Sequence, residues 1–190
     1  MTSKRLAFLC TASFLIFSSA YASRQLPDYP VKPASDYSIK VADAGAIVGV
    51  ELVEDVGQQK KYFDTRLAPL GVLPVFMVVQ NTSAADSIIF DRSALGLADP
   101  ADLSGKKNRT IASKLGSGGL VDLSQLRDLT DGREYMMKNQ IRSKTIAPGA
   151  SVSGFVYVPI PRDQPRGKIH LQVPITSAQT GESTVLNLEF

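Results

Sequence analysis

Short runs of β-branched and aromatic residues, separated by turn residues, constrain the fold of this chain more than any other feature of its sequence. The strongest run covers 72–80, and its Pro74 lies near the start, where a missing backbone N–H is tolerated. About seven short strands at this spacing predict a mainly β chain folded as an antiparallel sandwich. The other expected strands are 39–42, 46–53, 87–90, 151–159, 168–175 and 183–190.

Turn residues indicate how some of these strands connect. The polar segment 81–86 joins the strand at 72–80 to the strand at 87–90, which predicts a central β-hairpin. Pro148 and Gly149 predict a turn before the next strand, because proline presets φ and glycine permits a positive φ.

Two stretches lack the pattern of a strand or a helix. Residues 57–61 are polar and are expected to form a loop. Residues 105–119 contain several glycines and lysines and are expected to form a mobile loop.

Residues 92–142 depart from the β pattern and carry most of the helical signals. Asp122 is positioned to cap a helix over 123–129, and Asp131 to cap a second helix over 134–143. We therefore expect a helical insertion at 92–142, between the central hairpin and the C-terminal strands. This insertion is expected to lie across one edge of the β fold.

The first 22 residues have the three parts of a secretory signal peptide. Lys4 and Arg5 precede an apolar run at 6–17, which is followed by small residues and an Ala20-Tyr21-Ala22 cleavage site. The apolar run is shorter than the roughly 20 residues that a membrane-spanning helix needs. We expect cleavage, export to the periplasm or beyond, and no integral membrane segment in the mature protein. An uncleaved anchor is the alternative.

The rest of the chain divides into a tether and one domain. Prolines at 27, 30 and 33 disfavour a helix, so residues 23–36 are expected to form an extended tether or a poorly paired edge strand. Residues 37–190 are long enough for a single domain with a sizeable core. The only cysteine, Cys10, lies in the signal peptide, so the mature chain is expected to have no disulfide.

The charge of the chain argues against nucleic acid as a partner. The full sequence has 21 basic and 18 acidic residues and a net charge of +3. Since Lys4 and Arg5 would leave with the signal peptide, 19 basic residues would remain, for a net charge of +1. A nucleic-acid-binding domain would need a clustered basic face, and none is evident in the sequence.

Two motifs resemble those of exported bacterial immunoglobulin-like β-sandwich proteins of unknown function. The first is Tyr62-Phe63-Asp64 with Leu67, followed by a strand of the form G-x-x-P-V-x-x-x-x-x-N-x-S at 71–83. The second is Pro148-Gly149 followed by Ser153-Gly-Phe-Val-Tyr-Val at 153–158. The resemblance is taken to extend over about a third of the chain, although the motifs that carry it lie within residues 62–83 and 148–158. The resemblance implies an immunoglobulin-like sandwich and a binding or envelope-associated role, with no catalytic residues to transfer.

The sequence offers no convincing catalytic, metal or cofactor site. His170 is the only histidine, and neither a nucleophile nor an orienting acid is predicted near it. We therefore expect no catalytic residues, no metal and no cofactor. A calcium site stays open as an alternative, because calcium takes oxygen ligands and carboxylates gather around the insertion. These carboxylates are Asp91, Asp99, Asp102, Asp122, Asp128, Asp131 and Glu134.

The candidate partner-binding residues lie in the second expected helix of the insertion. Tyr135, Met136, Met137 and Ile141 form its apolar side, and methionines adapt to irregular partners. The alternative is that these residues cover the edge of the sandwich.

The favoured function is a non-enzymatic exported protein that binds another envelope or extracellular protein through the insertion. On this view, deleting 105–142 would leave the sandwich folded and abolish binding. The alternatives are a small ligand-binding protein or hydrolase with a pocket under the insertion, and a structural accessory of a surface complex.

Overall fold

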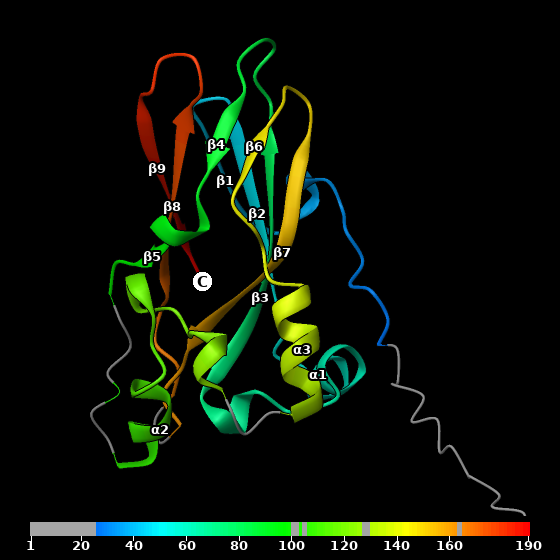
Figure 1. Ribbon diagram of the computed structural model, residues 1–190, viewed down its shortest axis with the longest axis vertical. Helices are drawn as coiled ribbons and strands as arrows, with labels where there is room; N and C mark the ends of the chain where they lie inside the picture. The colour runs from blue at the N-terminus through cyan, green and yellow to red at the C-terminus, as the bar shows by residue number, and fades with distance from the viewer. Residues whose placement is uncertain (1–25, 100–102, 104–105, 127–129, 163–164) are drawn as a thin grey trace, which may run out of the picture.

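The computed structural model describes residues 26–99, 103, 106–126, 130–162 and 165–190. In this part of the chain two antiparallel sheets pack together, with short helices at the lower end of the molecule in Figure 1. The expected mainly β, sandwich-like fold is confirmed, although with nine strands among the described residues. None of the described helices is long and apolar enough to cross a bilayer.

The first sheet has four strands in the order β1-β2-β3-β7. Its central strand β3 is buried at nine of ten positions, since β2 and β7 pair with both edges and apolar layers cover both faces. A strand buried on both faces reads as a continuous apolar run, as β3 does. The bounds are β1 (Ile39–Asp43), β2 (Ala46–Leu52), β3 (Val72–Asn81) and β7 (Ser151–Pro159).

The second sheet is built around β8, which pairs along one edge with β9 and along the other with both β5 and β4. β6 pairs with the outer edge of β4 and forms the border of this sheet. The bounds are β4 (Ile88–Phe90), β5 (Gly96–Leu97), β6 (Lys144–Ile146), β8 (His170–Ser177) and β9 (Ser183–Glu189).

The expected central hairpin is wrong, because β3 and β4 belong to different sheets. Both edges of β3 are occupied, so the chain crosses to the second sheet after Asn81. The buried Asn81 amide fixes this crossing. Its Nδ2 donates to the carbonyl oxygens of Asp86 at 2.8 Å and Ile146 at 2.9 Å, and its Oδ1 accepts from the Ser83 N–H at 2.9 Å.

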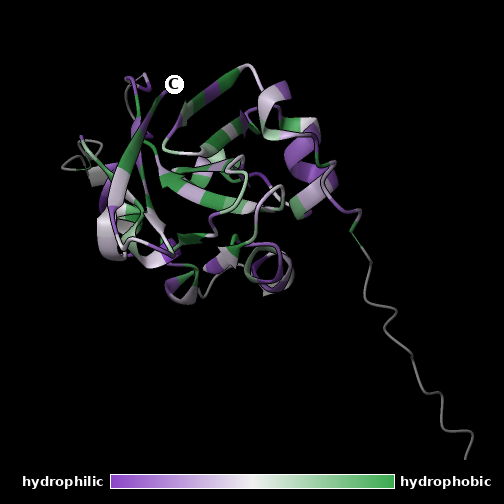
Figure 2. Cartoon of the chain, turned by 90° about the horizontal axis from the view of Figure 1, so that it is seen from above, coloured by the Kyte–Doolittle hydropathy of each residue, from purple (hydrophilic) through white to green (hydrophobic). Residues whose placement is uncertain are grey.

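The main hydrophobic core lies between the two sheets. Alternate residues of β2, β3 and β7 face alternate residues of β8 and β9 across it. Figure 2 shows the resulting bands of apolar and polar residues along the strands. The fully or nearly fully buried members include Val75, Met77, Phe90, Leu171 and Val173.

A second, aromatic-rich core covers the other face of the four-stranded sheet. Phe63 and Phe155 are fully buried at its centre, with their ring centroids 4.9 Å apart. The helices, the insertion and the N-terminal segment all contribute residues to it. Its other members include Tyr29, Tyr62, Phe76, Ile111, Leu123, Met136 and Tyr157.

The polar loop expected after residue 56 is instead the helix α1 (Val56–Phe63). Asp55 caps its N-terminus by accepting a backbone hydrogen bond from the first turn. Gln59 is fully buried, donating to the carbonyl of Val53 at 2.7 Å and accepting from the N–H of Leu67 at 2.8 Å. The Gln59 amide therefore links the segments on either side of the helix by internal hydrogen bonds. A hydropathy pattern along the sequence does not indicate such bonds. The chain then makes a 3₁₀ turn at Ala68–Leu70.

The insertion at 92–142 is helical only in short pieces. α2 (Arg109–Ala112) and α3 (Thr130–Lys138) are joined by turns, including one at Leu123–Gln125 that Asp122 caps. The second helix thus begins and ends earlier than expected, and Asp131 lies inside it. Residues 127–129 and 104–105 fall outside the described part. The expected mobile loop is, where described, folded structure, because Ile111 is buried and Leu115 bridges to Val121. Further 3₁₀ turns lie at Arg92–Ala94, Lys106–Asn108 and Ser117–Gly119.

The proline-rich segment before β1 is extended, as its prolines require, but it packs against the first sheet rather than forming a free tether. Tyr29 is 8% exposed and sits in the aromatic core. A 3₁₀ turn at Ala34–Asp36 follows, and Ala34 is fully buried. Its carbonyl oxygen lies where a side chain at Gly49 of β2 would begin, so a glycine is needed there for the close approach.

Candidate binding groove

A groove of about 600 Å³ opens between β6, at the border of one sheet, and β7, at the border of the other. Three segments form its walls. These are residues 28–31 of the N-terminal segment, residues 138–144 from the end of α3 to the start of β6, and residues 152–155 of β7. The groove therefore lies where the insertion, the N-terminal segment and the four-stranded sheet meet.

Aromatic side chains form the floor of the groove. The ring of Tyr29 lies 4.6 Å from that of Phe76 and 5.1 Å from that of Phe155, centroid to centroid. Phe76 and Phe155 are cross-strand partners on β3 and β7, with centroids 5.0 Å apart. The three rings lock one another in place, so the floor is apolar and rigid.

The rim of the groove is basic. Lys138, Arg142 and Lys144 are exposed along one wall, and Asp28 is the single carboxylate of the lining. Within the described residues, no carboxylate lies within ion-pair distance of these three cations. Their charge is therefore available to a ligand, and the field at the groove mouth is positive.

A second depression of about 520 Å³ continues this surface along helix α3. It shares Lys138 and Arg142 with the groove and adds Arg133, Glu134 and Met137. The Nε atom of Arg133 is buried without a hydrogen-bond partner among the described atoms. The two hollows together present four basic side chains and two carboxylates to solvent.

The edge of β7 is open at the groove. Backbone groups of alternate β7 residues point away from β3, and at Phe155 they are paired with the chain after α3: its N–H donates to Asn139 at 2.8 Å, and its carbonyl accepts from Ile141 at 3.0 Å. The equivalent groups of Ser151 and Ser153 have no backbone partner in the described part of the chain. This part of the sheet edge is therefore available for pairing.

Gly154 permits the close approach of the chain after α3 to β7. A Cβ atom at Gly154 would lie 2.5 Å from the backbone nitrogen of Ile141 and 2.9 Å from the carbonyl oxygen of Asn139. No side chain fits in that space. The glycine of the Ser-Gly-Phe motif thus brings the basic segment 138–144 next to the edge of β7.

Tyr135 ties the N-terminal segment to helix α3. Its hydroxyl donates a 2.6 Å hydrogen bond to the carbonyl of Pro27, and its ring lies edge-on to Phe63. Burial raises the pKa of Tyr135, and the Asp28 carboxylate adds to this effect, so the hydroxyl stays protonated as a donor. This bond positions the wall of the groove that carries Tyr29.

The four candidate partner-binding residues separate into two groups. Met136 and Ile141 are fully buried, so both have a structural role, which corrects the expectation that they are available to a partner. Met137 is 44% exposed and lines the second depression, and Tyr135 is half-buried beneath the N-terminal segment. A helix presents its apolar residues to the core on one side only, which explains why Met136 is buried and Met137 is exposed. Ile141 lies after the helix, in the segment that pairs with β7.

Sequence reasoning missed the basic rim and the open strand edge. A signal for the rim is present, since Arg133, Lys138, Arg142 and Lys144 lie close together in the chain. Their convergence depends on where the chain leaves α3 and enters β6, which the sequence pattern does not give. The open edge at Ser153 follows from pairing and carries no sequence signal.

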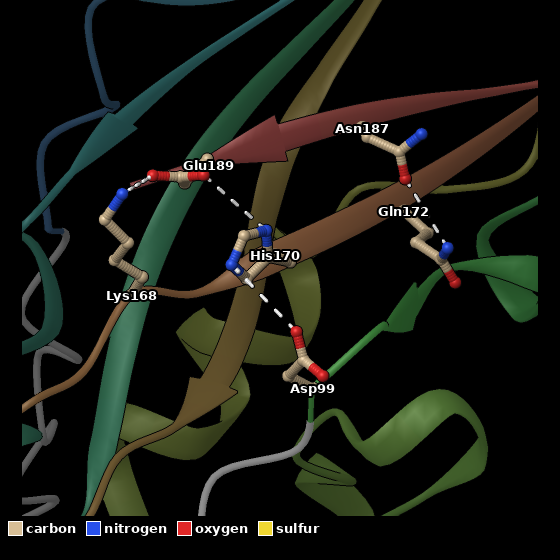
Figure 3. A network of polar contacts seen from close by, with 6 residues as sticks. All are labelled: Asp99, Lys168, His170, Gln172, Asn187 and Glu189. Atoms are coloured by element: carbon tan, nitrogen blue, oxygen red, sulfur yellow. Dashed lines mark hydrogen bonds and ion pairs between the residues drawn. The ribbon is translucent and has the colours of Figure 1, made fainter.

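His170 lies on β8, away from the groove, and the structure brings two acids to it (Figure 3). Its Nε2 is 4.0 Å from Asp99 Oδ2, and its Nδ1 is 3.9 Å from Glu189 Oε2. The prediction that no acid lies near His170 is therefore wrong. Lys168 also bonds to Glu189, and this bond lowers the pKa of the Glu189 carboxyl. The cluster is exposed and built from acids, bases and amides, which is typical of a solvated sheet surface.

The carboxylates considered for calcium act locally where they are described. Asp91 and Asp122 accept backbone hydrogen bonds that cap short turns, and Asp99 faces His170. Asp102, Asp128 and the side chain of Asp131 lie outside the described part. Among the described residues, no three histidine, cysteine or acidic side chains converge as a metal site.

The fold and this groove define a mainly β protein of two packed antiparallel sheets with a basic, aromatic-floored groove at one border. Comparisons with known protein families, with characterised proteins and with solved structures found no match for this chain.

Proposed function

We propose that the chain is an exported, non-enzymatic binding protein that acts on another protein of the cell envelope or its surroundings. The observation that carries this proposal is the groove between β6 and β7. It combines a rigid apolar floor, a basic rim and an open strand edge on one concave surface. A surface of this composition suits a protein partner, because aromatic and arginine side chains are enriched at such interfaces and contribute most to their binding energy.

The N-terminal sequence and the motif resemblance support the exported and immunoglobulin-like parts of the proposal. We propose cleavage after Ala22 and an immunoglobulin-like arrangement of the sandwich. The proposed cleavage and the proposed sandwich arrangement both agree with a stable β scaffold that carries a variable binding surface. The intact mass of the protein recovered from the cell envelope tests cleavage: a chain that begins at Ser23 supports it, and a chain that retains residues 1–22 contradicts it.

The main alternative is a small ligand-binding protein or hydrolase with a pocket under the insertion. Ile111, Leu123 and Met136 fill the space between the described insertion and the sheet, and each is at most 2% exposed. This packing argues against a pocket at that place. The groove lies beside the insertion, and the hydroxyls that line it, Ser143 and Ser153, come from different walls.

The proposal is tested by crosslinking the tagged protein in its host cells and identifying what it captures. We expect one dominant envelope partner, and we expect the pair of changes Arg142→Glu and Lys144→Glu to reduce its recovery strongly. Lys60→Glu on α1 is the matched control, since Lys60 is exposed and lies outside both hollows. Recovery of no partner, or equal recovery with all three proteins, would contradict the proposal.

A further inference from the structure

The four-stranded sheet ends at β7 with a border that is half covered and half open. At Phe155 the chain after α3 pairs with this border through Asn139 and Ile141, in parallel orientation. Toward the start of β7 the chain after α3 enters β6 of the other sheet, so the border of β7 is uncovered there: Ser153 lines the groove, and Ser151 lies beyond it on the same open edge. The N–H and carbonyl groups of Ser151 and Ser153 can therefore form hydrogen bonds with an added strand.

The side chains around this edge specify what kind of strand fits. Residues of an added strand would alternate between the two faces of the sheet. One face carries the aromatic floor with Tyr29 and Phe76, and Val31 stands 58% exposed beside it. The wall formed by residues 138–144 carries the exposed cations Arg142 and Lys144, and Lys144 belongs to β6 of the other sheet. An alternation of apolar and acidic residues complements both.

The charge of the chain itself argues against its own segments as occupants. Residues 1–25 contain Lys4, Arg5 and Arg24 and no acidic residue, so they would bring positive charge to a basic rim. A second copy of the chain has a formal net charge of +3, or +1 after the proposed cleavage, so it would bring no excess of negative charge to the rim either. An acidic segment of a different protein would bring negative charge to the rim and does not have this disadvantage.

We infer that the groove takes an extended acidic segment of a partner protein, which adds as a strand to the open edge of β7 at Ser151–Ser153. This inference rests on the proposed function and names the chemistry of its partner. The backbone bonds at Ser153 supply the attachment, and the basic rim supplies the selectivity for acidic residues.

The test uses the protein as purified from its host and a capped ten-residue peptide of alternating glutamate and valine. Binding is followed by fluorescence anisotropy. We expect saturable binding that weakens with added salt, and none with the same peptide carrying lysine in place of glutamate. Methylating the amide nitrogens that face β7 is expected to weaken binding about fivefold or more per blocked bond. This arm leaves the protein unaltered, so it does not depend on the folding of any variant.

Variants of the protein test the same two contributions, the backbone hydrogen bonds at Ser153 and the charge of the basic rim. Ser153→Pro removes the N–H that faces the groove and is expected to abolish binding, whereas Ser153→Ala keeps the backbone and is expected to bind normally. Removing charge with Arg142→Gln or Lys144→Gln should weaken binding about threefold each. Lys60→Gln, outside the groove, should leave it unchanged.

Three results would overturn the inference. They are no binding of the acidic peptide, binding that survives methylation of the peptide backbone, and binding of anionic lipid vesicles in place of the peptide. If the peptide fails while the cellular partner is still captured through Arg142 and Lys144, the inference fails and the proposed function stands. If no partner is captured at all, the proposed function itself fails.

Discussion

Asn81 shows how much of this fold depends on one polar side chain. It is fully buried and holds three backbone groups, those of Ser83, Asp86 and Ile146, at the place where the chain passes from one sheet to the other. Asn81→Ala would remove the amide donor from the Asp86 and Ile146 carbonyls, whereas the Ser83 N–H would keep its 3.1 Å hydrogen bond to the Gly45 carbonyl. We expect it to lower the free energy of unfolding by about 3 kcal/mol, measured by urea denaturation.

Thr82→Ala is the matched control, because Thr82 is exposed in the same turn. It should change the free energy of unfolding by less than about 0.5 kcal/mol. Equal effects of the two substitutions would contradict the role assigned to the Asn81 amide.

Asp91 makes stability depend on pH at the residue scale. Hydrogen bonds from the backbone and hydroxyl of Ser93, and from the hydroxyl of Ser143, lower its pKa below the ordinary value of 3.8. A carboxyl with a lowered pKa in the folded state stabilises the fold above its unfolded pKa and loses that contribution as the pH falls through its folded pKa. Asp91→Asn should therefore cost stability at about pH 6 and little at about pH 2 in urea denaturation. The same cost at both pH values would contradict this explanation.

At the scale of the element, strands with strong apolar patterns could be predicted and polar helices could not. The expected strand at 151–159 matches β7, since β-branched residues and a Pro-Gly turn define it. The turn itself has Gly149 at φ 73°, as expected. Helix α1 was missed because its buried Gln59 reads as a loop residue in sequence. Tertiary hydrogen bonds that satisfy a buried amide leave no periodic signal.

Gly154 decides whether β7 can accept the chain after α3. Gly154→Ala would place a methyl group 2.5 Å from the Ile141 nitrogen, so either the pairing at Phe155 breaks or the strand shifts. We expect a loss of about 2 kcal/mol in the free energy of unfolding, together with loss of amide protection at Ile141 in hydrogen exchange. Gly167→Ala is the control, because nothing lies within 4 Å of the added methyl. Retained protection at Ile141 would contradict the steric argument.

At the scale of the whole molecule, the insertion belongs to the fold. Ile111, Leu123 and Met136 fill the aromatic-rich core together with Phe63 and Phe155. Deleting residues 105–142 would expose that core, so the earlier expectation of a surviving sandwich is reversed. We expect the chain that lacks residues 105–142 to lose its cooperative unfolding transition in urea and its near-ultraviolet circular dichroism signal. An intact cooperative transition would show that the insertion is dispensable for folding.

The arrangement of the two sheets marks the limit of sequence reasoning at this scale. Segments 72–80 and 87–90 read as neighbours because a turn joins them, yet they pair in different sheets. Short-range turn signals define where the chain bends, whereas the choice of sheet depends on which edges other strands already occupy. The groove at the border of β7 depends on the same choice, so it could not be located from the sequence either.

The central claim is that this protein binds its partner through the groove between β6 and β7. The most direct measurement places a photo-crosslinking amino acid at Val31 or Lys144, which both line the groove, and as controls at Val185 or Ile89, which are each 40% exposed or more and lie outside both hollows. We predict one shared crosslinked product in cells from the two groove positions and none from the controls. A product that forms from the controls, or from neither groove position, would contradict the claim.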